Sequence, residues 1–107
     1  MALRKSERTM DLYIEAAAQV KILKDVLLET QVALSKVIPL KDSDRLDRVG
    51  RVLIDISDIA ECRMLRDHPE IENKDYERMF YGAISDDYGE LSHLVHERIQ
   101  IILGAIQ

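Results

Sequence analysis

The sequence has few of the residues that cross-link or stiffen a small fold. Its one cysteine, Cys62, has no partner within the chain for a disulfide, and a single free thiol is typical of a reducing compartment. We therefore expect a cytoplasmic protein. Tryptophan is absent, and the aromatic residues are one phenylalanine and four tyrosines. A hydrophobic core must therefore be built mainly from leucine, isoleucine, valine and alanine.

Long apolar runs are also missing, and this excludes one class of protein. No run approaches the roughly 20 residues that a membrane-spanning helix needs. Residues 1–8 are basic, but no apolar stretch follows them as it would in a signal peptide. The sequence therefore predicts a protein that does not enter or cross a membrane.

Positive charge is scarce in the second half of the chain. The net charge is −5 overall, with +1 in residues 1–66 and −6 in residues 67–107. Non-specific binding to nucleic acid needs a net basic face. Nucleic acid is therefore a disfavoured partner.

Apolar residues recur at helical spacing along almost the whole chain. Between residues 13 and 37 they are three or four positions apart, with only Thr30 interrupting the series, which places them on one stripe of an α-helix. This first stripe consists of Tyr13, Ala16, Val20, Leu23, Leu27, Leu34 and Val37. Pro39 disfavours helical angles in the residue before it. The pattern predicts a first helix from Ser6 or Thr9 to Ile38, with Leu27 fully buried.

Two further regions show the same period. The second begins at Asp42 or Ser43 and ends before Pro69, and the third begins near residues 73–75 and continues to the C-terminal residues. Gly82 and Gly89 permit a bend or a break near 82–89, and we expect one bent helix rather than two helices. The short linker at 39–43 favours an antiparallel return. The predicted fold is all-α, an antiparallel bundle of three long helices in a single domain, residues 1–107.

The helices carry more apolar residues than one packed face needs. A helix that is apolar on several faces is usually buried on several faces, and three helices cannot surround them all. We therefore expect a homo-oligomer, with a dimer as the commonest closed form, completed by coiled-coil-like contacts between helices. The residues expected at this interface are Ile22, Leu28, Ile101 and Leu103.

Acidic residues and histidine suggest one alternative chemistry. Glu90, His93 and Glu97 are three and four residues apart and so share one helix face, a spacing that carboxylate-bridged di-metal bundles use. Asp55 and Asp58 form an acidic pair on the second helix, and hard divalent cations prefer such oxygen ligands. The competing interpretation is a set of solvated polar faces, because short motifs have many chance matches.

One pattern bears on phosphate chemistry. The segment 88–91, taken with Asp55 and Asp58, resembles in part the all-α nucleoside triphosphate pyrophosphohydrolases. That family has the reverse order of acidic segments and a Glu-x-x-Glu motif, which this chain lacks, so membership does not follow. Arg51 lies four residues from both Asp47 and Asp55, the spacing of an exposed helix face with ion pairs.

These observations predict a non-enzymatic helical interaction module, an adaptor, regulator or assembly subunit that acts through an oligomeric surface on a protein partner and needs no cofactor. The first alternative is a divalent-metal-dependent helical-bundle enzyme or metal-binding protein. The second is a nucleic-acid accessory protein. Metal analysis of the purified protein separates the first two hypotheses.

Overall fold

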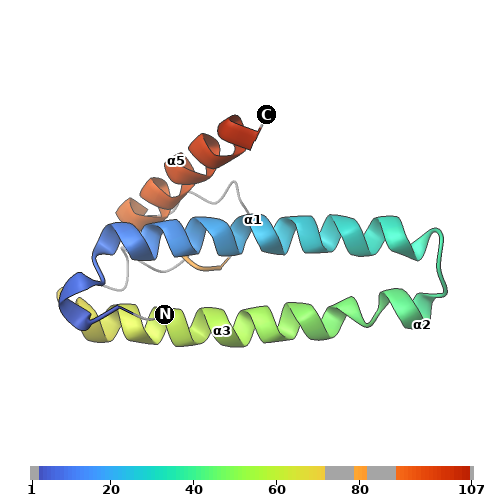
Figure 1. The fold of residues 1–107 in the computed structure, drawn as a ribbon, viewed down its shortest axis with the longest axis horizontal. Coiled ribbons are helices and arrows are strands. Elements are labelled where there is room, and N and C mark those ends of the chain that lie inside the picture. Colours follow the sequence, from blue (N-terminus) through green and yellow to red (C-terminus); the bar gives the residue numbers. More distant parts are fainter. Residues whose placement is uncertain (1–2, 72–78, 82–88, 107) are drawn as a thin grey trace.

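Every regular element in the described part of the chain is helical. The computed structural model describes residues 3–71, 79–81 and 89–106. Its elements in chain order are a 3₁₀ turn η1 (Lys5–Glu7), α1 (Met10–Ser35), α2 (Leu40–Ser43), α3 (Leu46–Asp67) and α5 (Gly89–Ile106). The helices α1 and α3 form an antiparallel hairpin, and α5 crosses the first half of α1 at an angle (Figure 1). The expected all-α fold, with three helices packing together, is confirmed.

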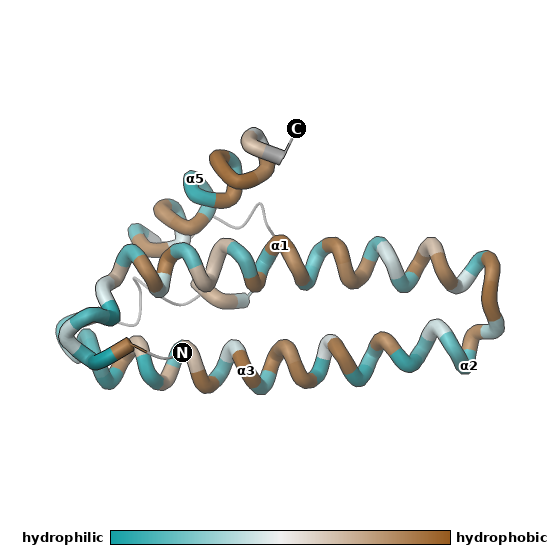
Figure 2. Tube along the Cα trace, in the orientation of Figure 1, coloured by the Kyte–Doolittle hydropathy of each residue, from teal (hydrophilic) through white to brown (hydrophobic). Residues whose placement is uncertain are grey.

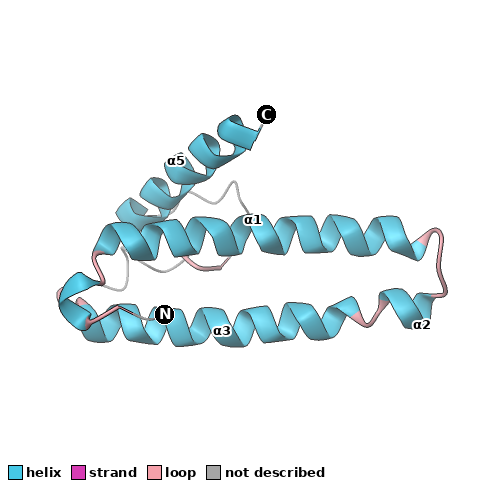
Figure 3. Ribbon diagram, viewed as in Figure 1, coloured by secondary structure: helices cyan, strands magenta, loops and turns pink. Residues whose placement is uncertain are grey.

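The ends of α1 follow from local backbone chemistry. Thr9 is extended, and its carbonyl accepts hydrogen bonds from the backbone N–H groups of Leu12 and Tyr13, as expected of an N-cap residue. At the other end the backbone N–H groups of Lys36 and Val37 donate to carbonyls three residues back, at 3.3 and 3.0 Å, the tighter bonding that often closes the last turn of a helix. The helix ends at Ser35, three residues before the expected boundary, and a loop carries the chain through Pro39 (Figure 3).

The expected second helix is present but divided. The four residues of α2 come first, and α3 begins only at Leu46, with Arg45 as its N-cap. The buried Ser43 hydroxyl donates to the carbonyl of Leu40, 3.0 Å away. This side-chain bond competes with the regular helical pattern, and we attribute the interruption to it.

The core lies at one end of the hairpin. Its buried apolar residues come from α1, α3, α5 and the segment 79–81, and they are Tyr13, Ala17, Ala18, Met64, Met79, Phe80, Val95 and Ile99. The small Ala17 and Ala18 side chains leave room for α5, where Ser92 is fully buried. Among the described elements, α5 therefore covers only the first half of α1.

The predicted stripe on α1 is correct at Tyr13 and wrong at several later positions, beginning with Ala16, which is exposed. Tyr13 is buried, as predicted, but Leu23 is 53% exposed and Leu27 is only half-buried. The physical reason is the length of α5, which has 18 residues against 26 in α1. Beyond the reach of α5, the described elements that pack against the second half of α1 are α3 and the short α2, so much of its apolar surface stays in contact with solvent.

The third region is not one continuous helix. Residues 79–81 form a bend, and α5 begins at Gly89, so the expectation of a single bent helix is wrong. Gly89 has a φ of 80°, a left-handed conformation that a residue with a Cβ rarely adopts. The expected helix start at 73–75 and the segment 82–88 lie outside the described residues.

Apolar and polar residues alternate along the hairpin instead of gathering into one apolar segment (Figure 2). None of the described helices has both the length and the hydropathy that crossing a bilayer requires. The alternation gives α1 and α3 more than one apolar face, and a two-helix hairpin can cover only one face of each helix.

Candidate interaction surface

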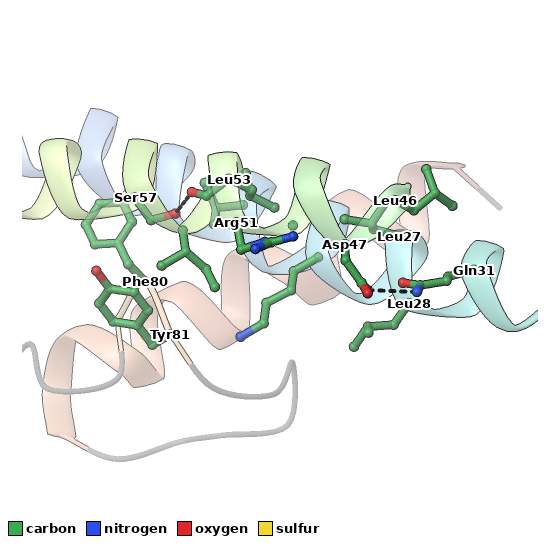
Figure 4. Close-up of a pocket in the computed structure, with 14 residues that line it drawn as sticks. Leu27, Leu28, Gln31, Leu46, Asp47, Arg51, Leu53, Ser57, Phe80 and Tyr81 are labelled. Carbon is green, nitrogen blue, oxygen red and sulfur yellow. Dashed lines mark hydrogen bonds between the residues drawn. The ribbon is translucent and has the colours of Figure 1, made fainter. Parts of the chain in front are cut away.

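An apolar groove follows the part of the hairpin that α5 leaves open. The groove has a volume of about 520 Å³ and takes its walls from α1 and α3. Its apolar lining residues are Val20, Leu27, Leu28, Leu46, Leu53, Ile54 and Phe80. Phe80 and Tyr81 lie at one end and Gln31 and Asp47 at the other, with Arg51 between them (Figure 4). We refer to this feature as the hairpin groove.

The charged residues of the hairpin groove are mostly basic. Lys24 and Arg51 both line it. Asp47 is the one carboxylate in the lining, and its Oδ1 accepts a 2.8 Å hydrogen bond from Gln31 Nε2. The sequence predicted that Arg51 would pair with Asp47, but the structure joins Asp47 to α1 instead. The groove is therefore apolar along its length and electropositive near its middle.

A second uncovered surface lies on α3. It consists of four large apolar residues that are 49–65% exposed and three or four positions apart, namely Val49, Val52, Ile56 and Ile59. Ile59 is nine residues from Gly50, or two and a half helical turns, so it faces away from the groove that Gly50 lines. We refer to these four residues as the α3 stripe. An apolar stripe at this spacing is the pattern by which helices pack on one another.

The residues predicted at an interface divide into two pairs. Leu28 lines the hairpin groove and is 57% exposed, and Ile101 on α5 is 60% exposed. Ile22 and Leu103 are partly buried against the core of the same chain. The first two are therefore accessible to a second molecule, whereas the others already contribute to the fold.

The predicted metal-ligating residues lie on two helices that both pack on α1. On α5, Glu90, His93 and Glu97 are exposed, and His93 Nε2 is 3.0 Å from Glu97 Oε1. On α3, Asp55 is exposed, and Asp58 accepts a hydrogen bond from the Tyr81 hydroxyl. Within the described ranges, no three histidine, cysteine or acidic side chains gather in a way that could hold a metal ion.

We expect divalent metal to have little effect on this protein. The exposed carboxylates of Glu90 and Glu97 are solvated, so metal binding would relieve little repulsion between them. Thermal unfolding with and without excess Zn²⁺ or Mn²⁺ should give the same melting temperature, and His93→Ala should behave like the wild type. A metal-dependent rise in melting temperature that His93→Ala removes would contradict this expectation, since a ligand bound to the native state stabilises it by mass action.

A buried polar cluster that the sequence analysis missed closes the end of the hairpin. Arg8, just before α1, donates from Nε and Nη2 to the two carboxylate oxygens of Asp67 at 2.6 and 2.9 Å. The Tyr13 hydroxyl donates to the same carboxylate, whose side chain is only 1% exposed. His68 Nε2 lies 2.9 Å from the Arg8 carbonyl oxygen, and its ring meets Tyr13 edge to face. We refer to Arg8, Tyr13, Asp67 and His68 as the polar clasp.

The polar clasp is built to hold the fold. The Arg8 guanidinium, and after it the Tyr13 hydroxyl, hold the pKa of Asp67 well below its usual range. Burial, followed by the bond to Asp67, raises the pKa of Tyr13. Near neutral pH the carboxylate is therefore charged and the phenol protonated, and each is engaged by the other. The Asp67 carboxylate and the Tyr13 phenol are consequently engaged within the clasp.

The hairpin topology could have revealed the clasp. In an antiparallel pair of similar length, the start of the first helix lies beside the end of the second, which brings Arg8 and Asp67 together. His68 precedes Pro69 in the sequence, a position typical of an exposed turn residue. The structure instead half-buries His68 beneath the N-terminal segment. A second cross-helix ion pair, between Glu15 of α1 and Arg98 of α5, was also missed.

No protein-family model matches this chain, and neither does any curated protein or solved structure. Evidence for the function therefore comes from the surface of the chain itself, and first from the hairpin groove. In the hairpin groove, Ser57 donates to the carbonyl of Leu53 at 2.8 Å, and Asp47 is engaged by Gln31. This leaves an apolar trough with basic residues, which suits the binding of another apolar surface.

Proposed function

We propose that this chain is a non-enzymatic helical interaction module, an adaptor, regulator or assembly subunit that works as a homo-oligomer. The observation that carries the proposal is the uncovered apolar surface of the α1–α3 hairpin, which lies in two places, the hairpin groove and the α3 stripe on the opposite side of α3. Large apolar patches left exposed on a monomer usually mark interaction sites.

Two structural features support this proposal. The polar clasp and the core lie at one end of the hairpin, so that end is held by α5 and by ion pairs. The rest of the hairpin extends beyond this support in a molecule 48 Å long and 26–27 Å across. A projecting helical pair with apolar faces gains stability when a second surface removes those faces from water. A dimer would bury the same patches on both chains.

The association state tests the proposal directly. Sedimentation velocity at micromolar concentration is expected to show a dimer or a larger oligomer, because the exposed apolar residues favour association. Ile101→Glu is expected to shift the distribution towards the monomer. Gln100→Glu is the matched control, since it adds the same charge at the neighbouring exposed position of α5.

The two variants separate a surface effect from a general charge effect. If Gln100→Glu dissociates the oligomer as much as Ile101→Glu does, net charge and not apolar burial controls association. A wild-type chain that stays monomeric at all accessible concentrations would refute self-association through this surface.

A further inference from the structure

The outer face of α5 combines acidic and apolar residues in one row. Its members are Glu90, Leu94, Glu97 and Ile101, which are four, three and four residues apart and therefore lie on one side of the helix. All four are exposed. The inner face of the same helix contains Ser92, Val95 and Ile99, which are fully buried against the rest of the chain. The outer row is thus accessible to a second molecule.

The outer row of α5 and the hairpin groove are complementary in shape and charge. The row is a convex ridge with two carboxylates, whereas the groove is a concave apolar trough lined by Lys24 and Arg51. Glu90 and Glu97 are seven residues apart, about 10 Å along a helix, and Leu94 lies between them. Amphipathic helices commonly bind this way, with apolar side chains in a groove and charged residues beside it.

We infer that the occupant of the hairpin groove is the outer face of α5 from a second copy of this chain. Leu94 and Ile101 enter the apolar trough, and Glu90 and Glu97 meet Lys24 and Arg51. This inference rests on the proposed function, because it names the partner and the contact through which the module associates. The two chains exchange the same contact twice around a two-fold axis, so each α5 fills the groove of the other chain.

The placement of α5 and of the hairpin groove is compatible with α5 helices that bind in each other's grooves. The C-terminal end of α5 diverges from the hairpin (Figure 1), and Ile101 near that end is exposed. The groove lies on the part of the hairpin that the chain's own α5 does not cover. A two-fold dimer contains this helix-in-groove contact twice, so the total buried area is double that of one contact and comes closer to the area that a stable interface needs.

A charge-reversal experiment with two variants tests the inference. The groove variant carries Lys24→Glu and Arg51→Glu, and the helix variant carries Glu90→Lys and Glu97→Lys. In a homodimer of either variant, like charges meet in both contacts. Each variant alone is therefore expected to associate at least about tenfold more weakly than the wild type, an effect within the range of close interfacial charge pairs.

Mixing the two variants gives the decisive measurement. In the mixed dimer, the acidic α5 of the groove variant meets the basic groove of the helix variant, and the basic α5 of the helix variant meets the acidic groove. Both contacts are again complementary, so sedimentation velocity and native mass spectrometry should show a heterodimer with affinity near that of the wild type. Circular dichroism of each variant confirms that the chain remains folded.

Control variants distinguish this inference from the proposed function. Arg63→Glu, a charge change at an exposed position of α3 outside the groove lining, should leave association unchanged. If Ile56→Glu in the α3 stripe abolishes the dimer while the two charge-reversed variants still associate, the α5-in-groove contact is wrong but self-association stands. If the charge-reversed variants separate and mixing does not restore a dimer, the contact is also wrong. A monomeric wild type would refute both proposals.

Discussion

Replacing Phe80 with alanine is expected to lower the free energy of unfolding by about 3–5 kcal/mol, the usual cost of removing a buried aromatic side chain. Phe80 is 2% exposed and belongs to the core cluster. It lies in the short segment 79–81 and also forms one end of the hairpin groove. Its removal would therefore open the place where this segment meets the hairpin. Urea denaturation followed by circular dichroism measures the change.

The same substitution by alanine at Leu27 and Leu23 provides a comparison for the stability loss expected at Phe80. The stripe on α1 predicts that both leucines are core residues, each costing several kcal/mol when replaced by alanine. From the structure we expect about 1–2 kcal/mol for the half-buried Leu27, and roughly 0.5 kcal/mol for Leu23, which is more than half exposed. The measurements require protein dilute enough to be monomeric, because association also stabilises the native state. If either leucine costs more than Phe80, the core lies along the predicted stripe instead.

Asp67→Asn is expected to cause the largest loss of stability among the polar substitutions. The asparagine keeps the shape of the side chain but removes the charge that two nitrogens of Arg8 and the Tyr13 hydroxyl engage. Because Asp67 is almost fully buried, water cannot replace those bonds. We expect the melting temperature to fall by several degrees. Asp55→Asn is the matched control on the same helix, since Asp55 is exposed, and it should leave the melting temperature nearly unchanged.

The loss of stability that Asp67→Asn causes should depend on pH. The pKa of Asp67 is lower in the folded chain than the usual value of about 3.9. Its contribution is therefore fully present above that value and is lost as the pH falls towards the folded pKa. The stability difference between wild type and Asp67→Asn should be constant near pH 7 and should shrink below about pH 4. Urea midpoints over this range test the expectation, and a difference that does not change with pH would contradict it.

Two other carboxylates also contribute to the pH dependence of both proteins. The guanidinium of Arg98 lowers the pKa of Glu15, so this group stabilises the fold above its usual pKa, as Asp67 does. Desolvation and then the nearby Asp58 raise the pKa of Glu61, so its contribution has the opposite sign and is lost as the pH rises. The Asp67→Asn variant should therefore retain some pH dependence, and the difference from wild type isolates Asp67.

The candidate interface shows how far periodicity alone can lead. An excess of apolar positions predicted uncovered faces, and Leu28 and Ile101 are indeed exposed. Ile22 and Leu103 belong to the same excess by sequence, yet they pack against the core. Periodicity ranks helix faces by composition, and it does not show which face a neighbouring helix covers. The choice between these residues depends on where α5 crosses α1.

The sequence by itself determined the helical class, the antiparallel return of the chain after Pro39 and the surplus of apolar side chains. These follow from local effects, namely the 3.6-residue period, the backbone limits of proline and the short linker. Tertiary structure alone decided that Ala17 and Phe80 are buried while Leu23 is exposed. It also decided that Arg8 and Asp67, 59 residues apart, form one ion pair. Burial and pairing depend on which helices meet and for how many turns. The length and crossing point of α5 set the burial along α1, and the antiparallel alignment of α1 with α3 sets the ion pair.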